Sequence, residues 1–397
     1  MARPKADAGP GPDRGEPLAV YLHWPYCARI CPYCDFNVHL DRRAGEGDRL
    51  VAAMVADLGD WRARTGPRRV GSVHFGGGTP SLLTGAQLST LIGAVASLWD
   101  AGGAEVALEA NPNDVTQDRV GAWRAAGLTR LSLGVQSFDD AVLARLGRDH
   151  DSDRAARAVS DAVAAFSSVS ADLIFGVAGE GGVAGEGGGR LDRDLGMLLE
   201  RGVPHISTYQ LTVEPGTAFA RAEARGQARA VGEEQSADAF EAIRARLSLA
   251  GYDHYEVSNF ATPGHESRHN LAYWKGHDYV GVGPGAHGRL WTDTGRVATE
   301  TALRPADYIE AVDRTGTGVT QRDLLAPDAA AEEYVLMGLR IADGIDLARL
   351  EAIRGEPFAV DSALIEQGLL HMKKGRLAAT PDGRMVLDAL TRALLVN

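Results

Sequence analysis

All three cysteines of this 397-residue chain lie close together, at Cys27, Cys31 and Cys34. Their spacing, C-x3-C-x2-C, allows three thiolates to converge on one small, soft metal centre. Iron–sulfur clusters with four irons are ordinarily held by four thiolates. Because this chain has no fourth cysteine, such a cluster would keep one iron open to a small molecule. The spacing therefore predicts a reactive centre.

Three other interpretations of the cysteines remain open at this point. A disulfide would leave one thiol over. A structural zinc site needs a fourth ligand, and His23 or His39 lies near enough in sequence to supply it. Buried inert thiols are common in proteins, but three packed so closely are unusual. We favour the cluster.

Composition narrows the class of protein. The length favours one large domain with a smaller one, and no apolar run reaches the roughly 18 residues that a membrane-spanning helix needs. Residues 1–16 are rich in Pro, Gly and charge, which predicts a disordered tail rather than a signal peptide. With free thiols, this favours a cytoplasmic protein. The net charge of −12 argues against nucleic acid as a partner.

Short β-rich segments alternate with helical stretches over the first two thirds of the chain. The expected strands are Leu18–His23, Val70–Phe75, Glu105–Glu109, Arg130–Gly134, Ala171–Phe175 and His205–Leu211, with His254–Val257 as a further candidate. The expected helices between them include Asp48–Thr65, Thr84–Trp99 and Thr116–Ala126. This alternation predicts an α/β fold in which parallel strands form a partial or complete β/α barrel.

Polar and glycine residues follow the ends of these strands. The first strand runs into the cysteines, the second ends in Gly76–Pro80, the third in Glu109–Pro112 and the fourth in Gly134–Ser137. Because the carboxyl ends of barrel strands share one rim, these groups are expected to gather above the cysteine loop.

Two further regions stand out. The segment Gly176–Arg190 is glycine-rich and predicts a flexible loop, interpreted as a surface insertion. Residues 305–397 show two helical runs, a small hairpin and a last helix (Pro381–Leu395), which is the order of a winged-helix module. This part has 15 Asp and Glu against 10 Lys and Arg, so we expect it to act as a cover or protein contact rather than to bind DNA.

The cysteine loop and the strand ends together resemble the radical S-adenosylmethionine (SAM) superfamily. The likeness is nearest to its coproporphyrinogen III oxidase-like subfamily, which includes oxygen-independent oxidases and haem chaperones of the HemW type. The matching segments are Tyr21–Cys27, Gly76–Pro80, Glu109–Pro112, Gly134–Ser137, Asp172–Gly176 and Tyr279–His287. The resemblance implies a [4Fe-4S] cluster on the three cysteines, with SAM on the open iron.

The resemblance also implies which residues contact SAM. They are Tyr21, Tyr33, Gly77, Gly78, Thr79, Glu109, Gln136, Arg148 and Asp172. Their chemistry suits the role, since glycines admit close backbone approach, carboxylates accept from hydroxyl or ammonium groups, and arginine pairs with a carboxylate. The short loop usual in the family after the Asp172 strand is replaced here by the glycine-rich segment, which leaves contacts from that loop in doubt.

Two features separate the subfamilies. The oxidases usually carry a further cysteine two residues after the third, where this chain has Phe36. The segment His269–Trp274 matches the H-N-x-x-Y-W block typical of the haem chaperones, which implies haem contacts from His269, Asn270, Tyr273 and Trp274. A histidine can ligate haem iron, and flat aromatic side chains pack against a porphyrin.

The expected function is that of a haem chaperone that passes haem to an acceptor protein, with oxygen-independent coproporphyrinogen III oxidase as the alternative. A membrane-associated acceptor and a homodimer are further expectations from the resemblance. The expected division is a tail at 1–16, a barrel at 17–290 that holds cluster, SAM and haem, and a winged-helix-like domain at 305–397.

Overall fold

The structure is a computed structural model that describes residues 15–40, 45–179 and 189–395. Most of the expected N-terminal tail and residues 180–188 of the glycine-rich segment lie outside the described residues.

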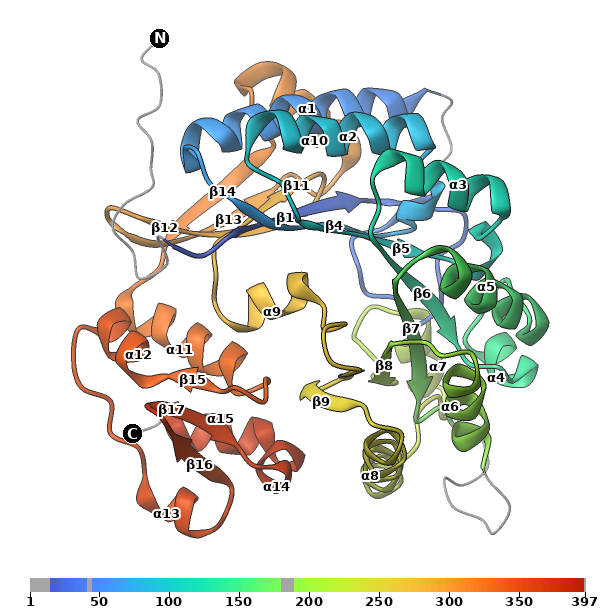
Figure 1. Cartoon of the computed structure of the whole chain (residues 1–397), viewed down its shortest axis with the longest axis vertical. Coiled ribbons are helices and arrows are strands. Elements are labelled where there is room, and N and C mark those ends of the chain that lie inside the picture. Colours follow the sequence, from blue (N-terminus) through green and yellow to red (C-terminus); the bar gives the residue numbers. More distant parts are fainter. Residues whose placement is uncertain (1–14, 41–44, 180–188, 396–397) are drawn as a thin grey trace.

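A twelve-stranded sheet forms the body of the molecule (Figure 1). Seven neighbouring strands run parallel, in the order β11-β1-β4-β5-β6-β7-β8. They are β1 (Leu18–Trp24), β4 (Val70–Gly77), β5 (Glu105–Ala110), β6 (Arg130–Gln136), β7 (Ser168–Phe175), β8 (His205–Gln210) and β11 (Tyr279–Val282). The six strands expected between Leu18 and Leu211 are all present, and the fold is a β/α barrel that stays open.

Antiparallel strands extend both edges of the parallel sheet. Beyond β8 come β10 (Asn259–Ala261) and β9 (Asp253–Glu256), and beyond β11 come β12 (His287–Thr292), β13 (Gly295–Thr301) and β14 (Val319–Leu324). The seventh expected strand is therefore β9, an antiparallel edge strand. The sheet continues past residue 305, because β14 pairs with β13 from Val297↔Leu324 to Thr301↔Val319.

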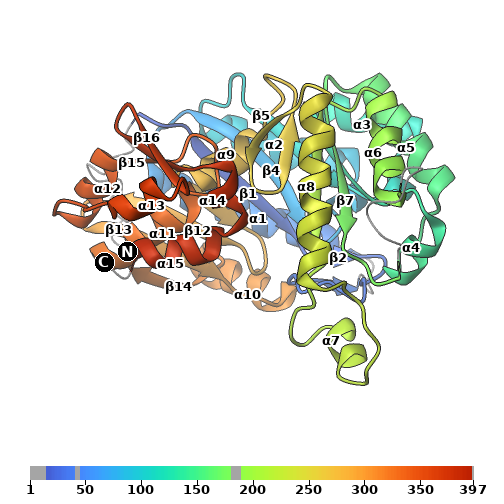
Figure 2. The ribbon, with the colours of Figure 1, turned by 90° about the horizontal axis from the view of Figure 1, so that it is seen from below.

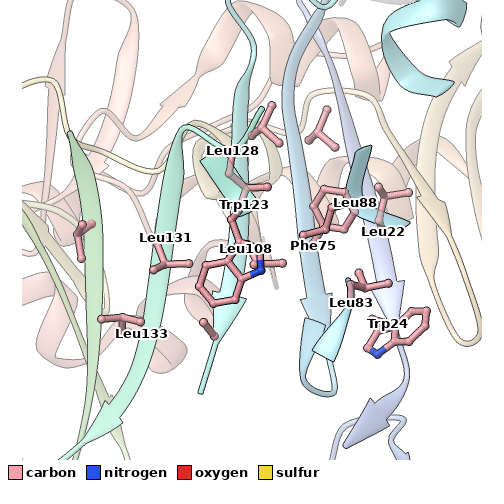
Figure 3. Close-up of a cluster of buried hydrophobic side chains, with 14 of the residues drawn as sticks. Leu22, Trp24, Phe75, Leu83, Leu88, Leu108, Trp123, Leu128, Leu131 and Leu133 are labelled. Atoms are coloured by element: carbon pink, nitrogen blue, oxygen red, sulfur yellow. The ribbon is translucent and has the colours of Figure 1, made fainter. Parts of the chain in front are cut away.

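Apolar side chains on the outer face of the sheet pack against a layer of helices. In β1 and β4 the residues Leu22, Trp24 and Phe75 meet Leu83 and Leu88 in this core (Figure 3). The helices of this side are α1 (Glu46–Thr65), α2 (Gly85–Leu98), α3 (Gln117–Ala126), α4 (Asp140–Arg145), α5 (Ser152–Ala165), α6 (Arg190–Glu200), α8 (Glu233–Leu249) and α10 (Pro305–Thr315). The three expected helices correspond to α1, α2 and α3.

The inner face of the sheet is polar. Apolar and polar side chains therefore alternate along the strands, instead of each strand being apolar throughout. The short helix α9 (Arg268–Trp274) lies against this inner face, on the side of the sheet opposite α1 and α2 (Figure 1). The hydroxyl of Ser72 on β4 and Nδ1 of His269 on α9 are 3.1 Å apart. We call α9 the floor helix.

The C-terminal residues have a hydrophobic core of their own, from Ala330 to Leu394. Their elements are α11 (Pro327–Gly338), β15 (Ile345–Asp346), α12 (Leu347–Arg354), α13 (Ser362–Glu366), β16 (Leu370–Lys373), β17 (Arg376–Ala379), α14 (Pro381–Met385) and α15 (Leu387–Leu395). The expected last helix is divided, because Val386 leaves the helical conformation with φ of −121° and ψ of 30°. The segment after α11 covers β9, with backbone bonds from Val257 N–H to Arg340 and from Ala342 N–H to Tyr255.

Candidate functional site

The cysteine loop is tied to the rim by backbone hydrogen bonds. Cys27 ends β2 (Tyr26–Cys27), which pairs with β3 (His39–Leu40). The amides of Gly78 and Thr79 donate to the carbonyls of Trp24 and Tyr26, at 2.7 and 2.9 Å. The loop that follows β4 is thus held directly against the start of the cysteine segment.

A second contact holds the middle of the cysteine loop. The amide of Phe219 on α7 (Ala218–Glu223) donates to the carbonyl of Pro32 at 3.0 Å, and the Phe219 ring lies 6.1 Å from that of Tyr33. Figure 2 shows α7 projecting from the body at the end where β2 lies. Sequence reasoning missed Phe219, because nothing in its local sequence points to a contact with a loop so distant along the chain.

The three thiols open on one cavity of about 560 Å³ at the carboxyl ends of the strands. Burial raises the pKa of the Cys27 and Cys34 thiols above the ordinary value. Nη1 of Arg148 lies 3.3 Å from the sulfur of Cys31, and its Nη2 donates to the carbonyl of Gly134 at 3.2 Å. Three thiols that share a cavity with a cation on one sulfur fit a cluster held by three thiolates.

The two histidines named for a zinc site differ, because Nε2 of His39 is buried without a hydrogen-bond partner among the described residues, whereas His23 is engaged. The ring nitrogens of His23 lie 3.1 Å from the Tyr21 hydroxyl and 2.9 Å from the Asn37 carbonyl, so both are engaged. Within the described ranges, no group of three His, Cys, Asp or Glu side chains is arranged to hold a metal ion, and this applies to the three cysteines as much as to a zinc site.

The cavity gathers most of the residues that the family resemblance assigned to SAM. Those that line it are Tyr33, Gly77, Gly78, Thr79, Glu109, Gln136, Arg148 and Asp172. Gln136 has a φ of 65°, a conformation rarely adopted by residues other than glycine, at an irregularity in the pairing of β6 with β7. Burial raises the pKa of Asp172 from 3.8 to about 6, and the hydroxyl of Ser132 lies 3.3 Å from its carboxylate.

Tyr21 differs from this group, because it does not line the cavity. Its ring lies beneath the glycine loop, where a Cβ on Gly76 would come within 2.9 Å of it. A Cβ on Gly77 would come within 2.6 Å of the His23 ring, and Gly77 has a φ of 108°. The glycines are therefore required by the side chains packed below the loop, as well as by any ligand above it.

The residues assigned to haem lie apart from the cavity. His269, Asn270, Tyr273 and Trp274 belong to the floor helix, and none of them lines the cavity. The side chain of His269 is buried at 2% exposure, and burial lowers its pKa well below 6.5, so the ring is neutral. Tyr273 and Trp274 are half-buried, and the guanidinium of Arg340 lies 5.0 Å from the Trp274 ring.

Comparison with known proteins assigns the family and the fold. Residues 21–182 match the radical SAM superfamily, and residues 325–386 match the HemN C-terminal domain. A protein of Mycobacterium tuberculosis named heme chaperone HemW is 40% identical over 98% of this chain and 97% of its own length. This chain belongs to the HemW family of radical SAM proteins.

Other relatives agree with this family assignment. HemW of Escherichia coli is 38% identical over 96% of this chain and 99% of its own length. A bovine protein named radical S-adenosyl methionine domain-containing protein 1, mitochondrial, is 37% identical over 99% of this chain and 91% of its own. The solved coproporphyrinogen III oxidase HemN of Escherichia coli has a TM-score of 0.77 at 22% identity, covering 95% of this chain and 90% of its own, which shows a shared fold.

Membership of the radical SAM superfamily implies a [4Fe-4S] cluster and SAM, and the cavity has the donor set for both. In the part of the chain that the structure describes, no helix is long and apolar enough to cross a membrane.

Proposed function

We propose that this chain is a haem chaperone, which binds haem and transfers it to an acceptor protein while holding a [4Fe-4S] cluster and SAM. The observation that carries the proposal is the likeness, along nearly the whole chain, to proteins of two bacteria that are named heme chaperones. Phe36 supports it, because it stands where the oxidases usually have a further cysteine and its side chain is 64% exposed at the cavity.

In this proposal the cluster is held by Cys27, Cys31 and Cys34. The cluster, when bound, supplies an iron with an open position and a source of electrons. Arg148 stabilises negative charge on the Cys31 sulfur and pairs with the SAM carboxylate, while Glu109 accepts from its hydroxyl or ammonium groups. Tyr33, Gly77, Gly78, Thr79, Gln136 and Asp172 complete the walls around SAM.

The floor helix supplies the haem ligands in this proposal. Nε2 of His269 is buried and has no hydrogen-bond partner among the described residues, so it can accept a metal ion without losing a bond. Tyr273 and Trp274 offer apolar ring surface. Because His269 is buried, haem reaches it only when the floor helix moves away from β4, and we expect haem binding to be slow.

The proposed partners are haem and a haem-acceptor protein, in the reducing cytoplasm, where three free thiols persist. A homodimer and a membrane-associated acceptor are part of the same proposal. Nucleic acid is not a proposed partner, because the wing-bearing segment after residue 305 is net acidic.

The proposal is tested by an anaerobic haem titration of the cluster-loaded protein, followed through the Soret band. We expect one haem per chain and a loss of affinity of at least tenfold in His269→Ala, since an axial ligand is removed. The control is His254→Phe, which alters a half-buried histidine, stacked at 4.4 Å on Phe260 and outside the cavity. Equal haem affinity in wild type and His269→Ala would contradict the assignment of the haem site.

The alternative is an oxygen-independent coproporphyrinogen III oxidase, which the shared fold with HemN favours. It predicts that the reduced, cluster-loaded protein converts coproporphyrinogen III to vinyl-bearing product in the presence of SAM.

A further inference from the structure

A stack of three aromatic rings lies on the inner face of the barrel between the cavity and the floor helix. The His74 ring on β4 lies parallel to the His269 ring, with centroids 4.6 Å apart and planes 12° apart. Tyr21 of β1 stacks on both, at 6.1 Å from His74 and 6.0 Å from His269. His74 is thus fixed on one side by the helix assigned to haem.

On its other side, His74 contacts the cavity. Its Nε2 lies 3.0 Å from Oε1 of Glu109, and because a carboxylate only accepts, the ring donates this hydrogen bond. The Glu109 side chain is 41% exposed and lines the cavity, whereas that of His74 is 13% exposed and does not. The hydrogen bond therefore holds a cavity residue from beneath.

The stacked rings fix the direction in which Nε2 of His74 donates its hydrogen bond. Rotation of an imidazole about its outer torsion is broad and weakly restricted, so the ring needs neighbours to fix it. The two rings pack face to face, with planes 12° apart, so a turn of the His74 ring would break this contact. Nδ1 of His74 is buried without a hydrogen-bond partner among the described residues. The orientation of the ring therefore depends on the bond from Nε2 to Glu109 and on the stacked rings.

We propose that His74 is a positioning residue that aims the Glu109 carboxylate at SAM and transmits the position of the floor helix to the SAM site. The inference rests on the proposed function only in placing SAM against Glu109. A shift of His269 would remove the surface against which His74 is stacked, and the carboxylate would lose its fixed orientation. SAM and haem would then influence each other's affinity equally.

The first test separates the hydrogen bond from the ring. His74→Phe keeps a flat ring on His269 but cannot donate, while His74→Gln keeps an N–H near the place of Nε2. We expect the Kd of SAM, measured by anaerobic equilibrium dialysis of cluster-loaded protein, to rise at least tenfold in His74→Phe and to return to within about threefold in His74→Gln. The His254→Phe control should leave the Kd unchanged. Wild-type affinity in His74→Phe would overturn the proposal.

The second test addresses the stack. His269→Ala removes the ring under His74, although residue 269 does not line the SAM cavity, and we expect it to weaken SAM binding several-fold. His269→Phe restores a flat ring and should recover most of that loss. Equal SAM affinity in His269→Ala and wild type would overturn transmission through the stack.

These outcomes are distinct from the fate of the haem proposal. Haem affinity should fall in both His269→Ala and His269→Phe, because both lack the ligating nitrogen, whereas SAM affinity should fall mainly in His269→Ala. A protein that binds SAM but no haem would contradict the chaperone function, and the His74 comparison would still be decided by the SAM measurements.

Discussion

Asp57 is a carboxylate buried on the outer side of the barrel, where α1 meets α10 and the approach to β14. It accepts hydrogen bonds from the Tyr308 hydroxyl at 2.7 Å, the Thr317 hydroxyl at 3.0 Å and the Gly318 amide at 3.1 Å. Even with these donors, burial raises its pKa from 3.8 to about 6. One side chain thus joins α1 to segments much later in the chain and carries a cost when it ionises.

The raised pKa predicts a pH dependence of stability. Between pH 4 and pH 6 the folded state holds a proton at Asp57 that the unfolded state has lost, so the free energy of unfolding falls as pH rises, by about 3 kcal/mol in all. We expect this fall to be absent in Asp57→Asn when its free energy of unfolding is measured by urea denaturation across the same pH range. Tyr308→Phe, which keeps the carboxylate but removes a donor, should shift the fall to higher pH. If the free energy of unfolding fell with pH equally in wild type and Asp57→Asn, the pH dependence would not come from Asp57.

At the scale of elements, the turn between β4 and the following segment depends on packing from below. Gly77→Ala would place a Cβ 2.6 Å from the His23 ring at a φ of 108°. We expect it to lower the free energy of unfolding by about 1–3 kcal/mol and to reduce iron incorporation, since His23 also holds the Asn37 carbonyl in the cysteine loop. Chemical denaturation and iron content per chain measure the two effects.

The matched control lies in the middle of α2. A Cβ on Gly93 meets no heavy atom within 4 Å, so Gly93→Ala should stabilise the helix by about 0.5–1 kcal/mol and leave iron content unchanged. The account of the turn would be wrong if Gly77→Ala matched wild type in stability and iron content.

Elements with a local pattern could be predicted from the sequence, and long-range placement could not. The alternation in Leu18–Trp24 and the capping box at Thr84 mark β1 and α2 directly. The floor helix could not be placed in this way, because Ser72 and His74, its contacts on β4, lie far away in the sequence. The strands β11 to β14 were missed for a related reason, because β11 pairs with β1 and the other three follow it along the sheet, at an edge that depends on where the chain returns.

The residues of the candidate site also differ in whether the sequence could predict them. The cysteine spacing and the strand-end residues predicted the cavity, because parallel strands bring their carboxyl ends to one rim whatever the details. His74 carries no such signal, since it lies in the interior of a strand shortly before Gly77, and a lone histidine there is most often a satisfied polar group.

At the scale of the whole molecule, the C-terminal residues secure the floor helix. Arg349 donates to the Gly276 carbonyl at 2.9 Å, just after α9, and its guanidinium lies 4.9 Å from the Tyr334 ring. Arg340 stacks on Trp274. We propose that residues from about 325 onward form a domain that restrains the floor helix and so controls access to His269.

Arg349→Ala should loosen this restraint. Loss of the hydrogen bond to the Gly276 carbonyl is expected to cost about 0.5–1.5 kcal/mol, so amide hydrogen exchange in residues 268–277 should become roughly 2–13 times faster. The control is Arg354→Ala, whose contacts to Glu356 and Phe358 stay within the C-terminal part. Unchanged exchange in residues 268–277 of Arg349→Ala would contradict the restraint.

The central claim is that this member of the HemW family handles haem rather than oxidising a porphyrinogen. The most direct measurement uses one anaerobic, cluster-loaded preparation, divided between a haem titration and an incubation with coproporphyrinogen III, SAM and a reductant. We predict stoichiometric haem binding with a Soret band sensitive to His269→Ala, and no vinyl-bearing product. Decarboxylated product together with an absence of specific haem binding would contradict the account and identify an oxidase.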